Sequence, residues 1–386
     1  MKLSLIKIII LLIPSLLLCQ FTPANKQELQ VAINEWKNDN ANALNVYGSI
    51  AQWDVSNITD MSGLFSSFPT FNDNINSWDV SNVTTMRAMF SDAQLFNQPL
   101  NAWNVSNVID MGDMFFLAFN FNQDISNWDV SSVTNTQFMF YEAQSFNQDI
   151  GGWNTSSITN MQGMFNDAET FNQNIGDWDV SNVTNMDSMF QDADSFNQDI
   201  SGWDVSNVTT MRAMFLDNNS SIDAVHIDNV FNQNLNNWNV SNVTNMKMMF
   251  YGAVNFNQPL NSWSVVSVTD MTNMFHQAGL STKNYDDILI AWSQQIVKNN
   301  VTLGASGINY CNGEDARQIL IDSYGWTITD NGLDCSSLGN ENPKILLDGD
   351  VHILRKGSLI IKGENGLCYR IKIINSEISL EVTNCN

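Results

Sequence analysis

The chain of 386 residues is long enough for more than one domain. Its hydrophobic fraction of 44% supports a sizeable core, which excludes a disordered chain. The 40 Asp and Glu residues outnumber the 16 Lys and Arg residues and give a formal net charge of −24. Because a surface of this sign repels other polyanions, the composition argues against nucleic acid and anionic membranes as partners.

Residues 1–19 have the pattern of a signal peptide. Lys2 and Lys7 precede an apolar stretch, 8–18, that is too short to span a membrane. We predict cleavage after Cys19, so that Gln20 begins the mature chain. Lipidation of Cys19 is the alternative, although Leu18 is larger than the residue that usually precedes a lipid-bearing cysteine. No later stretch has the ~20 apolar residues of a membrane span, and we expect an extracellular protein that is secreted or held at the cell surface.

Residues 20–45 predict a helical cap. Thr22 is the expected N-cap and Pro23 the expected first helical residue of an amphipathic run that ends near Lys37. Such a helix would cover the open end of the region that begins at residue 46.

Residues 46–280 consist of a repeated unit. Nine tryptophans mark it, with a spacing of 25 residues and a single step of 35: Trp53, Trp78, Trp103, Trp128, Trp153, Trp178, Trp203, Trp238 and Trp263. Each unit has an aliphatic residue three positions before its Trp, Val or Ile five positions after it, and later an apolar pair that is Met-Phe in all but the first copy. A unit this short cannot bury its own apolar face, so nine copies predict a stacked solenoid. We expect short parallel strands around F-N-Q-D-I and W-D-V-S, and a helical turn over 186–193.

The unit N-W-D-V-S-N-V-T-N-M, followed by M-F and F-N-Q, resembles the repeat of the BspA-like leucine-rich-repeat surface proteins, in the divergent form found in Bacteroidetes and mycoplasmas. The resemblance covers about residues 45–280. It implies a leucine-rich-repeat-like solenoid and an exported or surface-attached protein that acts in adhesion or protein interaction. It brings no catalytic residue and no cofactor.

Residues 281–337 predict a second cap, with helices over 285–295 and 313–324, and residues 338–386 predict a small antiparallel β module. The β module serves either as an attachment tail or as a plain structural domain. Four cysteines follow the signal segment, and an even number in an exported chain indicates two disulfides. Three pairings exist; the sequence-local one joins Cys311 to Cys335 and Cys368 to Cys385. A metal site is the alternative, but C-x-x-C pairs are absent from the sequence.

Three columns of the repeat invite a chemical interpretation. The Asp or Asn after each Trp in all but the last copy would stack carboxylates, which indicates either Ca²⁺ or turns in which the side chain accepts nearby backbone N–H groups. The Asn-Gln pair that follows Phe indicates either a polar binding strip or an internal amide ladder. The Trp column would stack on sugar rings if exposed, but its alternation with Val favours the core.

An insertion of ten residues breaks the repeat between Phe215 and Phe231. Insertions in repeat proteins fall in loops, often on the binding face. It gives a candidate binding loop, with a neutral surface loop as the alternative. The candidate residues are Asn218, Asn219, Asp223, His226 and Asp228.

The sequence as a whole favours a non-catalytic protein that binds proteins or glycans of a host or neighbouring cell surface. One alternative is a polysaccharide-acting enzyme on a β-solenoid, in which paired carboxylates would cleave sugars. An enzyme must break the repeat to bring unlike residues together, whereas here nearly every unit repeats its neighbours. The other alternative is self-association into a surface layer.

Overall fold

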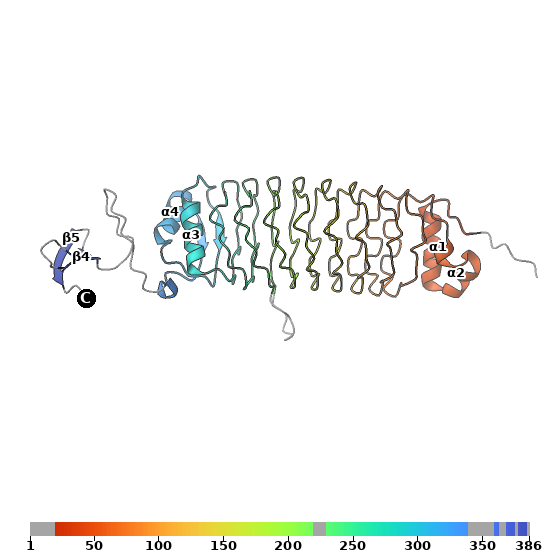
Figure 1. Cartoon of the computed structure of the whole chain (residues 1–386), viewed down its shortest axis with the longest axis horizontal. Coiled ribbons are helices and arrows are strands. Elements are labelled where there is room, and N and C mark those ends of the chain that lie inside the picture. The colour runs from red at the N-terminus through yellow and green to blue at the C-terminus, as the bar shows by residue number, and fades with distance from the viewer. Residues whose placement is uncertain (1–19, 219–228, 339–358, 363–367, 375–376, 384–386) are drawn as a thin grey trace, which may run out of the picture.

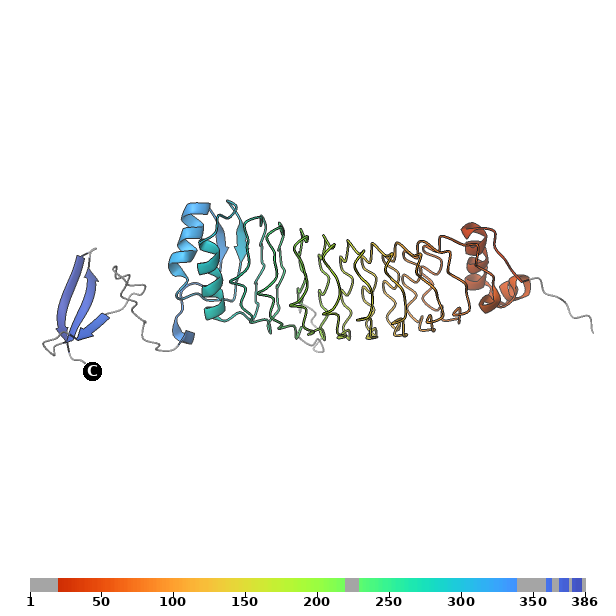
Figure 2. The same cartoon turned by 45° about the horizontal axis from the view of Figure 1, so that its top comes forward.

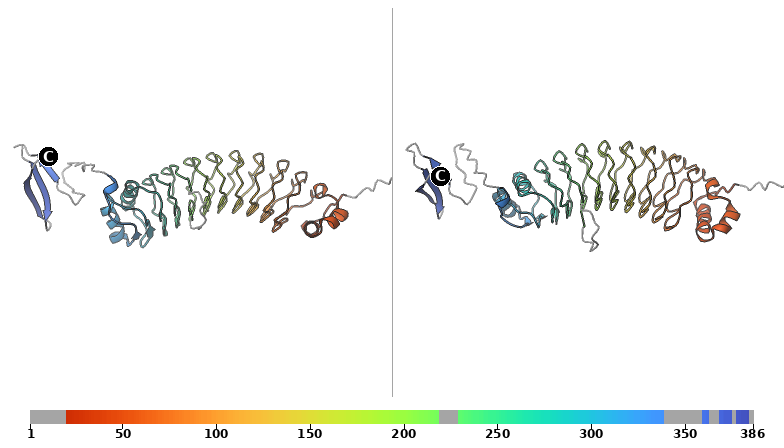
Figure 3. Two further views of the ribbon diagram at one scale, coloured as in Figure 1. Left: turned by 90° about the horizontal axis from the view of Figure 1, so that it is seen from below. Right: turned by 60° about the horizontal axis from the view of Figure 1, so that its bottom comes forward.

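The computed structural model describes residues 20–218 and 229–338, together with three strands between residues 359 and 383. The predicted signal peptide, 1–19, and the greater part of the candidate loop, 219–228, lie outside the described residues. Figure 1 shows the repeats as a row of coils with α1 and α2 at one end and α3 and α4 at the other. Seen from other sides, the row of coils is curved (Figure 3).

Two helices, α1 (Lys26–Asn38) and α2 (Asn40–Tyr47), cover the first coil, and a short 3-10 helix, η1 (Ile50–Gln52), follows them. The predicted start of α1 was wrong by three residues, because Asn25 and not Thr22 is the N-cap. The Asn25 side chain accepts the N–H of Glu28 at 3.1 Å, and the Glu28 carboxylate accepts the N–H of Ala24 at 2.9 Å. Asn is a stronger N-cap than Thr, and this reciprocal pair satisfies two backbone donors at once.

The nine coils, numbered one to nine after their Trp residues, are joined by backbone pairing in parallel orientation. We count positions within a coil from its Trp. At position +7 a single residue of each coil bridges to the same position of the next, from Asp60 with Thr85 through to Asn245 with Asp270. The 25-residue spacing therefore corresponds to one turn of the stack, including across the step of 35, where Thr210 bridges to Asn245.

The predicted strands and helical turn of the repeat were wrong. Within the described coils the backbone forms tight turns and isolated bridges, and 186–193 is a series of turns. Ser188 and Asp192 adopt the left-handed conformation, with φ of 55° and 51°, which an α-helix does not accommodate. Alternate N–H groups then point sideways: Ser188 donates to the carbonyl of Arg212 in the next coil at 2.7 Å, while Met189 donates back to Met186 at 3.3 Å. The helix-like apolar spacing is real, but stacked turns bury the same positions.

The core consists of continuous aromatic columns. The Phe of each Met-Phe or Leu-Phe pair stacks on its equivalent in the next coil, with ring centroids 5.5 to 5.9 Å apart. The Trp of each of the nine coils is buried and donates its indole N–H to a carbonyl of the preceding coil or cap, as Trp178 does to Ile150 at 3.0 Å. Burial of the Trp column excludes it as a platform for sugar stacking and supports the core interpretation.

The Asn-Gln column is an amide ladder that uses both residues of the pair. Asn172 Oδ1 accepts the backbone N–H of Asn197 at 3.1 Å and the side-chain amide of Gln198 at 2.8 Å. The same pattern recurs from Asn72 to Asn232. Since these amides satisfy one another between coils, they serve the stack and not an external ligand.

Left-handed residues at positions +10 and +14 give a stability prediction. Ser67 is exposed with φ of 53°, a conformation that costs a non-glycine residue about 1 kcal/mol. Ser67→Gly should raise the free energy of unfolding by about that amount in urea denaturation. The neighbouring exposed Ser66 has no positive φ, so Ser66→Gly should lower stability, and an equal response of the two variants would contradict the prediction.

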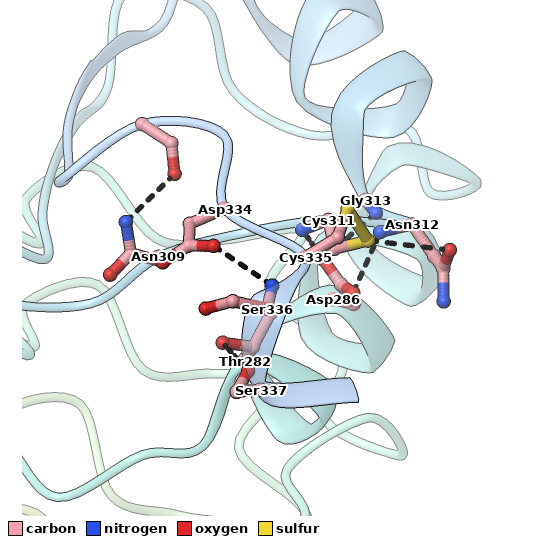
Figure 4. The surroundings of a disulfide bond; sticks show 11 residues. Thr282, Asp286, Asn309, Cys311, Asn312, Gly313, Asp334, Cys335, Ser336 and Ser337 are labelled. Carbon is pink, nitrogen blue, oxygen red and sulfur yellow. Dashed lines mark hydrogen bonds between the residues drawn. A yellow bond between two sulfur atoms is a disulfide. The ribbon is translucent and has the colours of Figure 1, made fainter. Parts of the chain in front are cut away.

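The C-terminal end keeps the period of the coils while helices replace part of each turn. It contains α3 (Thr282–Ser293), β1 (Thr302–Gly304), α4 (Glu314–Tyr324), β2 (Thr327–Thr329) and η2 (Ser336–Leu338). Strands β1 and β2 are parallel, with Thr302 opposite Thr327, a separation of 25 residues. Figure 2 shows this strand pair beside α3 and α4. Cys311 and Cys335 form a disulfide with a Cα–Cα distance of 5.0 Å, the first of the two predicted pairs (Figure 4).

The strands β3 (Leu359–Lys362), β4 (Cys368–Ile374) and β5 (Glu377–Thr383) form an antiparallel sheet in that order. Cys368 is the first residue of β4, whereas Cys385 lies outside the described residues. The second predicted disulfide therefore stays a prediction.

Candidate binding face

Four positions of the coil vary from copy to copy while the core positions around them repeat. These are positions +9, +10, +13 and +14, in the segment where neighbouring coils exchange backbone hydrogen bonds. We call the surface that they form the variable face. From coil three to coil six these positions hold Gly112, Asp113, Phe116, Leu117, Gln137, Phe138, Tyr141, Glu142, Gln162, Gly163, Asn166, Asp167, Asp187, Ser188, Gln191 and Asp192, of which Gly112, Gly163, Asn166 and Ser188 are buried and the others partly exposed.

The variable face carries all the basic residues of the repeats. Between residues 50 and 280 the sequence has three, Arg87, Arg212 and Lys247, and each occupies position +9 of its coil. Arg87 pairs with Asp113 of the next coil, with 2.5 Å between guanidinium and carboxylate. Burial nevertheless raises the pKa of Asp113, which the nearby Arg87 opposes. The few basic side chains of the repeats therefore lie on the variable face, in a chain in which acidic side chains predominate.

Three partly exposed rings form an aromatic cluster on the face, Phe116, Phe138 and Tyr141. The Phe116 and Tyr141 rings stack with centroids 4.6 Å apart, and Phe138 meets Tyr141 edge-on at 5.8 Å. Phe138 lies against Gly163 of the next coil so closely that a Cβ there would be 2.2 Å from the ring. Glycine at this place leaves room for the ring in its present position and adopts the φ of 57° without strain.

Four carboxylates, Glu142, Glu169, Asp192 and Asp194, act electrostatically on Asp167, and we call the five residues the acidic cluster. Burial raises the pKa of Asp167 to about 7, and repulsion from the other four carboxylates adds to the effect. Burial, and then the charge of Glu142, raise the pKa of Tyr141 to about 12. The charges of the acidic cluster therefore act on Tyr141 of the aromatic cluster.

A buried polar atom lies within the same coils. Asn166 is 5% exposed, and its Oδ1 atom has no hydrogen-bond partner. It occupies position +13 of coil five, the column in which Phe116 and Tyr141 stack, and precedes Asp167 in the chain. A buried acceptor without a donor is costly, which makes this atom an unusual feature of an otherwise satisfied coil.

The candidate loop begins and ends beside the acidic cluster. The N–H of Asn218 donates to Asp192 Oδ1 at 2.7 Å, and the N–H of Val230 donates to the carbonyl of Asp194 at 3.1 Å. Asn229 closes the loop by donating its N–H to Asp217 Oδ2 at 2.9 Å. The other candidate residues, Asn219, Asp223, His226 and Asp228, lie outside the described residues.

The Asp column after Trp forms local turns, in agreement with the second of its two interpretations. Asp179 Oδ1 accepts the N–H of Ser181 at 3.0 Å and its hydroxyl at 2.6 Å, and these bonds lower the pKa of Asp179. In the part of the chain that the structure describes, no group of three or more His, Cys, Asp or Glu side chains is placed to hold a metal ion. The column therefore gives no support to a Ca²⁺ site.

Sequence reasoning missed the variable face because it concentrated on the positions that repeat. The nine copies contain a signal that could have revealed it. Four of their positions have no consensus residue, and all three basic residues of the repeats occupy one of these positions. The sequence could not indicate that the Phe138 ring lies against Gly163 of the next coil, since this depends on how neighbouring coils pair.

A comparison with known protein families finds one family that matches the repeats. The family described as "Mycoplasma protein of unknown function, DUF285" matches residues 33–151, 118–229 and 225–303, which together cover most of the chain. The chain belongs to this family. The DUF285 matches run from the second half of α1 through all nine coils and α3 to residue 303, within β1. No curated protein and no solved structure matches the chain.

None of the helices within the described ranges of this DUF285 protein has the length and apolar character needed to cross a membrane.

Proposed function

We propose that this DUF285 protein is a secreted or surface-displayed binding protein without catalytic activity, which contacts partners through its variable face. The observation that carries the proposal is the contrast within each coil. Core positions repeat because every coil must fit its neighbours, whereas positions +9, +10, +13 and +14 repeat neither in charge nor in size. Stacked repeats commonly offer such an extended surface to a partner.

Two further proposals concern the kind of protein. The parallel bridges at each coil and the curvature of the row support a solenoid of the leucine-rich-repeat type, similar to the BspA-like surface proteins. The disulfide supports an oxidising compartment and agrees with removal of residues 1–19 on export.

A binding experiment tests the function. The full chain, produced in an exporting host and labelled, should bind intact host or neighbouring cells in flow cytometry. A variant with Phe138→Ala, Tyr141→Ser and Lys247→Ser should lose this binding. Each new residue already occupies the same position in another coil, as Ala88, Ser91 and Ser62 do, so the fold should persist.

The matched control carries Asp129→Asn, Asp179→Asn and Asp204→Asn in exposed turns away from the variable face, where Asn104 stands in another coil. Equal binding by both variants would overturn the proposal. Release of reducing sugars from common polysaccharides would instead favour an enzyme.

A further inference from the structure

We propose that two copies of this chain join end to end through their N-terminal caps, residues 20–49 with α1 and α2. This inference goes beyond the proposed function, because it concerns a second surface and a second copy of the same chain. The cap lies at one end of the row of coils and α3 and α4 lie at the other (Figure 1). Two rods joined in this way would direct their C-terminal ends away from each other and would leave both variable faces free.

The outer side of the cap is apolar. Val31 lies on the side of α1 opposite to the four buried residues of that helix, Leu29, Ala32, Ile33 and Trp36. It is 56% exposed, and Leu44 and Val46 of α2 are 49% and 60% exposed. Three large apolar residues are thus presented to solvent within one short cap.

The same cap has a hollow, lined by Phe21, Gln27, Glu28, Val31 and Tyr47. The Phe21 and Tyr47 rings form one of its walls, with centroids 4.7 Å apart. Leu44 lies one helical turn before Tyr47, so these two side chains are neighbours on α2. When two caps meet about a two-fold axis, each supplies both a hollow and the apolar residues that can fill the hollow of its partner.

Charge favours this end as the place where two copies meet. Residues 20–49 include two basic and three acidic residues, whereas residues 50–280 include three basic and 24 acidic ones. Rods of this charge repel each other side by side, but end to end their coils stay apart. The opposite end also exposes apolar residues, Ile296, Ile319 and Leu333, but residues 281–338 include three basic and seven acidic residues.

The charged side chains of the cap are engaged within their own chain. Lys26 pairs with Asp60 at 3.0 Å, and the Glu28 carboxylate accepts the N–H of Ala24 at 2.9 Å. The other three also have hydrogen-bond partners in the same chain: Glu35, Lys37 and Asp39. Contact between two caps therefore depends on apolar burial. Salt should strengthen it, because salt screens the repulsion between the two chains.

Sedimentation and small-angle scattering of the mature full chain test the inference. Sedimentation should show a monomer–dimer equilibrium at micromolar concentration, with a dissociation constant that falls at least threefold from 50 to 500 mM salt. Scattering should give the dimer nearly twice the maximum dimension of the monomer. Val31→Gln with Leu44→Gln should weaken the dimer at least tenfold. Both residues are exposed and Gln suits a helix, so the cap should stay folded.

The control variant, Leu95→Gln with Val254→Gln, removes a Leu and a Val of similar exposure, 49% and 46%, from the coils. It should keep the dissociation constant within twofold, and equal weakening in the two variants would overturn the contact between caps. A dimer of unchanged length would indicate side-by-side association, and growth beyond the dimer would indicate head-to-tail contact. Either result would overturn the inference, as would a chain that stays monomeric. Cell binding through the variable face is measured separately, so failure here leaves the proposed function standing.

Discussion

Replacing Asp286 with alanine is expected to unfold the C-terminal end of the stack. Asp286 lies on α3, is 2% exposed and accepts three backbone N–H groups, from Cys311, Asn312 and Gly313, each at 2.8 Å (Figure 4). These residues lead into α4, whose N-cap, Gly313, makes no side-chain cap of its own. One carboxylate thus supplies the acceptors for the start of the next helix.

The expected loss is on the order of 2 to 6 kcal/mol, since the N–H groups of Cys311 and Gly313 are buried and each stranded buried donor costs roughly 1 to 3 kcal/mol. This is comparable with the whole stability of many domains. Because coils in a repeat protein contact only their neighbours, the damage should stay local. Hydrogen exchange should show rapid exchange over residues 282–337 and unchanged protection in coils one to six.

The neighbouring Asp287 provides the matched control. It belongs to the same helix and forms an exposed ion pair with Lys283 at 2.6 Å. Asp287→Ala should change stability by less than ~0.5 kcal/mol. If the two variants exchanged alike, Asp286 would not hold the cap.

Asp167→Asn is expected to stabilise the protein at alkaline pH and to flatten its pH dependence. Burial and neighbouring carboxylates raise the pKa of Asp167 to about 7 in the folded chain, against 3.8 as its ordinary value. Between these values the folded state holds a proton that the unfolded state has lost. Stability therefore falls as the pH rises through this range, and the deficit persists above pH 7.

The variant should be more stable than the parent at pH 8 by on the order of 2 kcal/mol, after allowance for partial exposure and solvent screening. The two proteins should converge near pH 4. Urea denaturation from pH 4 to pH 8 measures the difference, and carbon NMR of the Asp167 carboxyl measures the pKa directly. Asp129→Asn should gain nothing at pH 8, because hydrogen bonds from Ser131 already lower the pKa of Asp129. Parallel pH profiles for Asp167→Asn and the parent would show that Asp167 is not strained in this way.

The period, the buried columns and the cap helices could be predicted because they depend on repetition and apolar spacing. Trp178, Met186 and Phe190 are all buried as their spacing indicated. The local backbone conformation could not be predicted, since a series of turns with left-handed residues buries the same positions as a helix. The N-cap of α1 could not be predicted from the preference for Thr22 before Pro23 either. Asn25 is the N-cap because its side chain and that of Glu28 together satisfy two backbone donors.

The amino-acid sequence specifies how many coils there are and which side chains form their core, because nine copies of one apolar pattern can be buried only by stacking on one another. The tertiary structure alone decided the surface. Phe138, Tyr141 and Asp167 come from two coils, and only the sideways pairing between coils and the left-handed residues at positions +10 and +14 bring them together. Repetition specifies the core, whereas the proposed binding site depends on the residues that do not repeat.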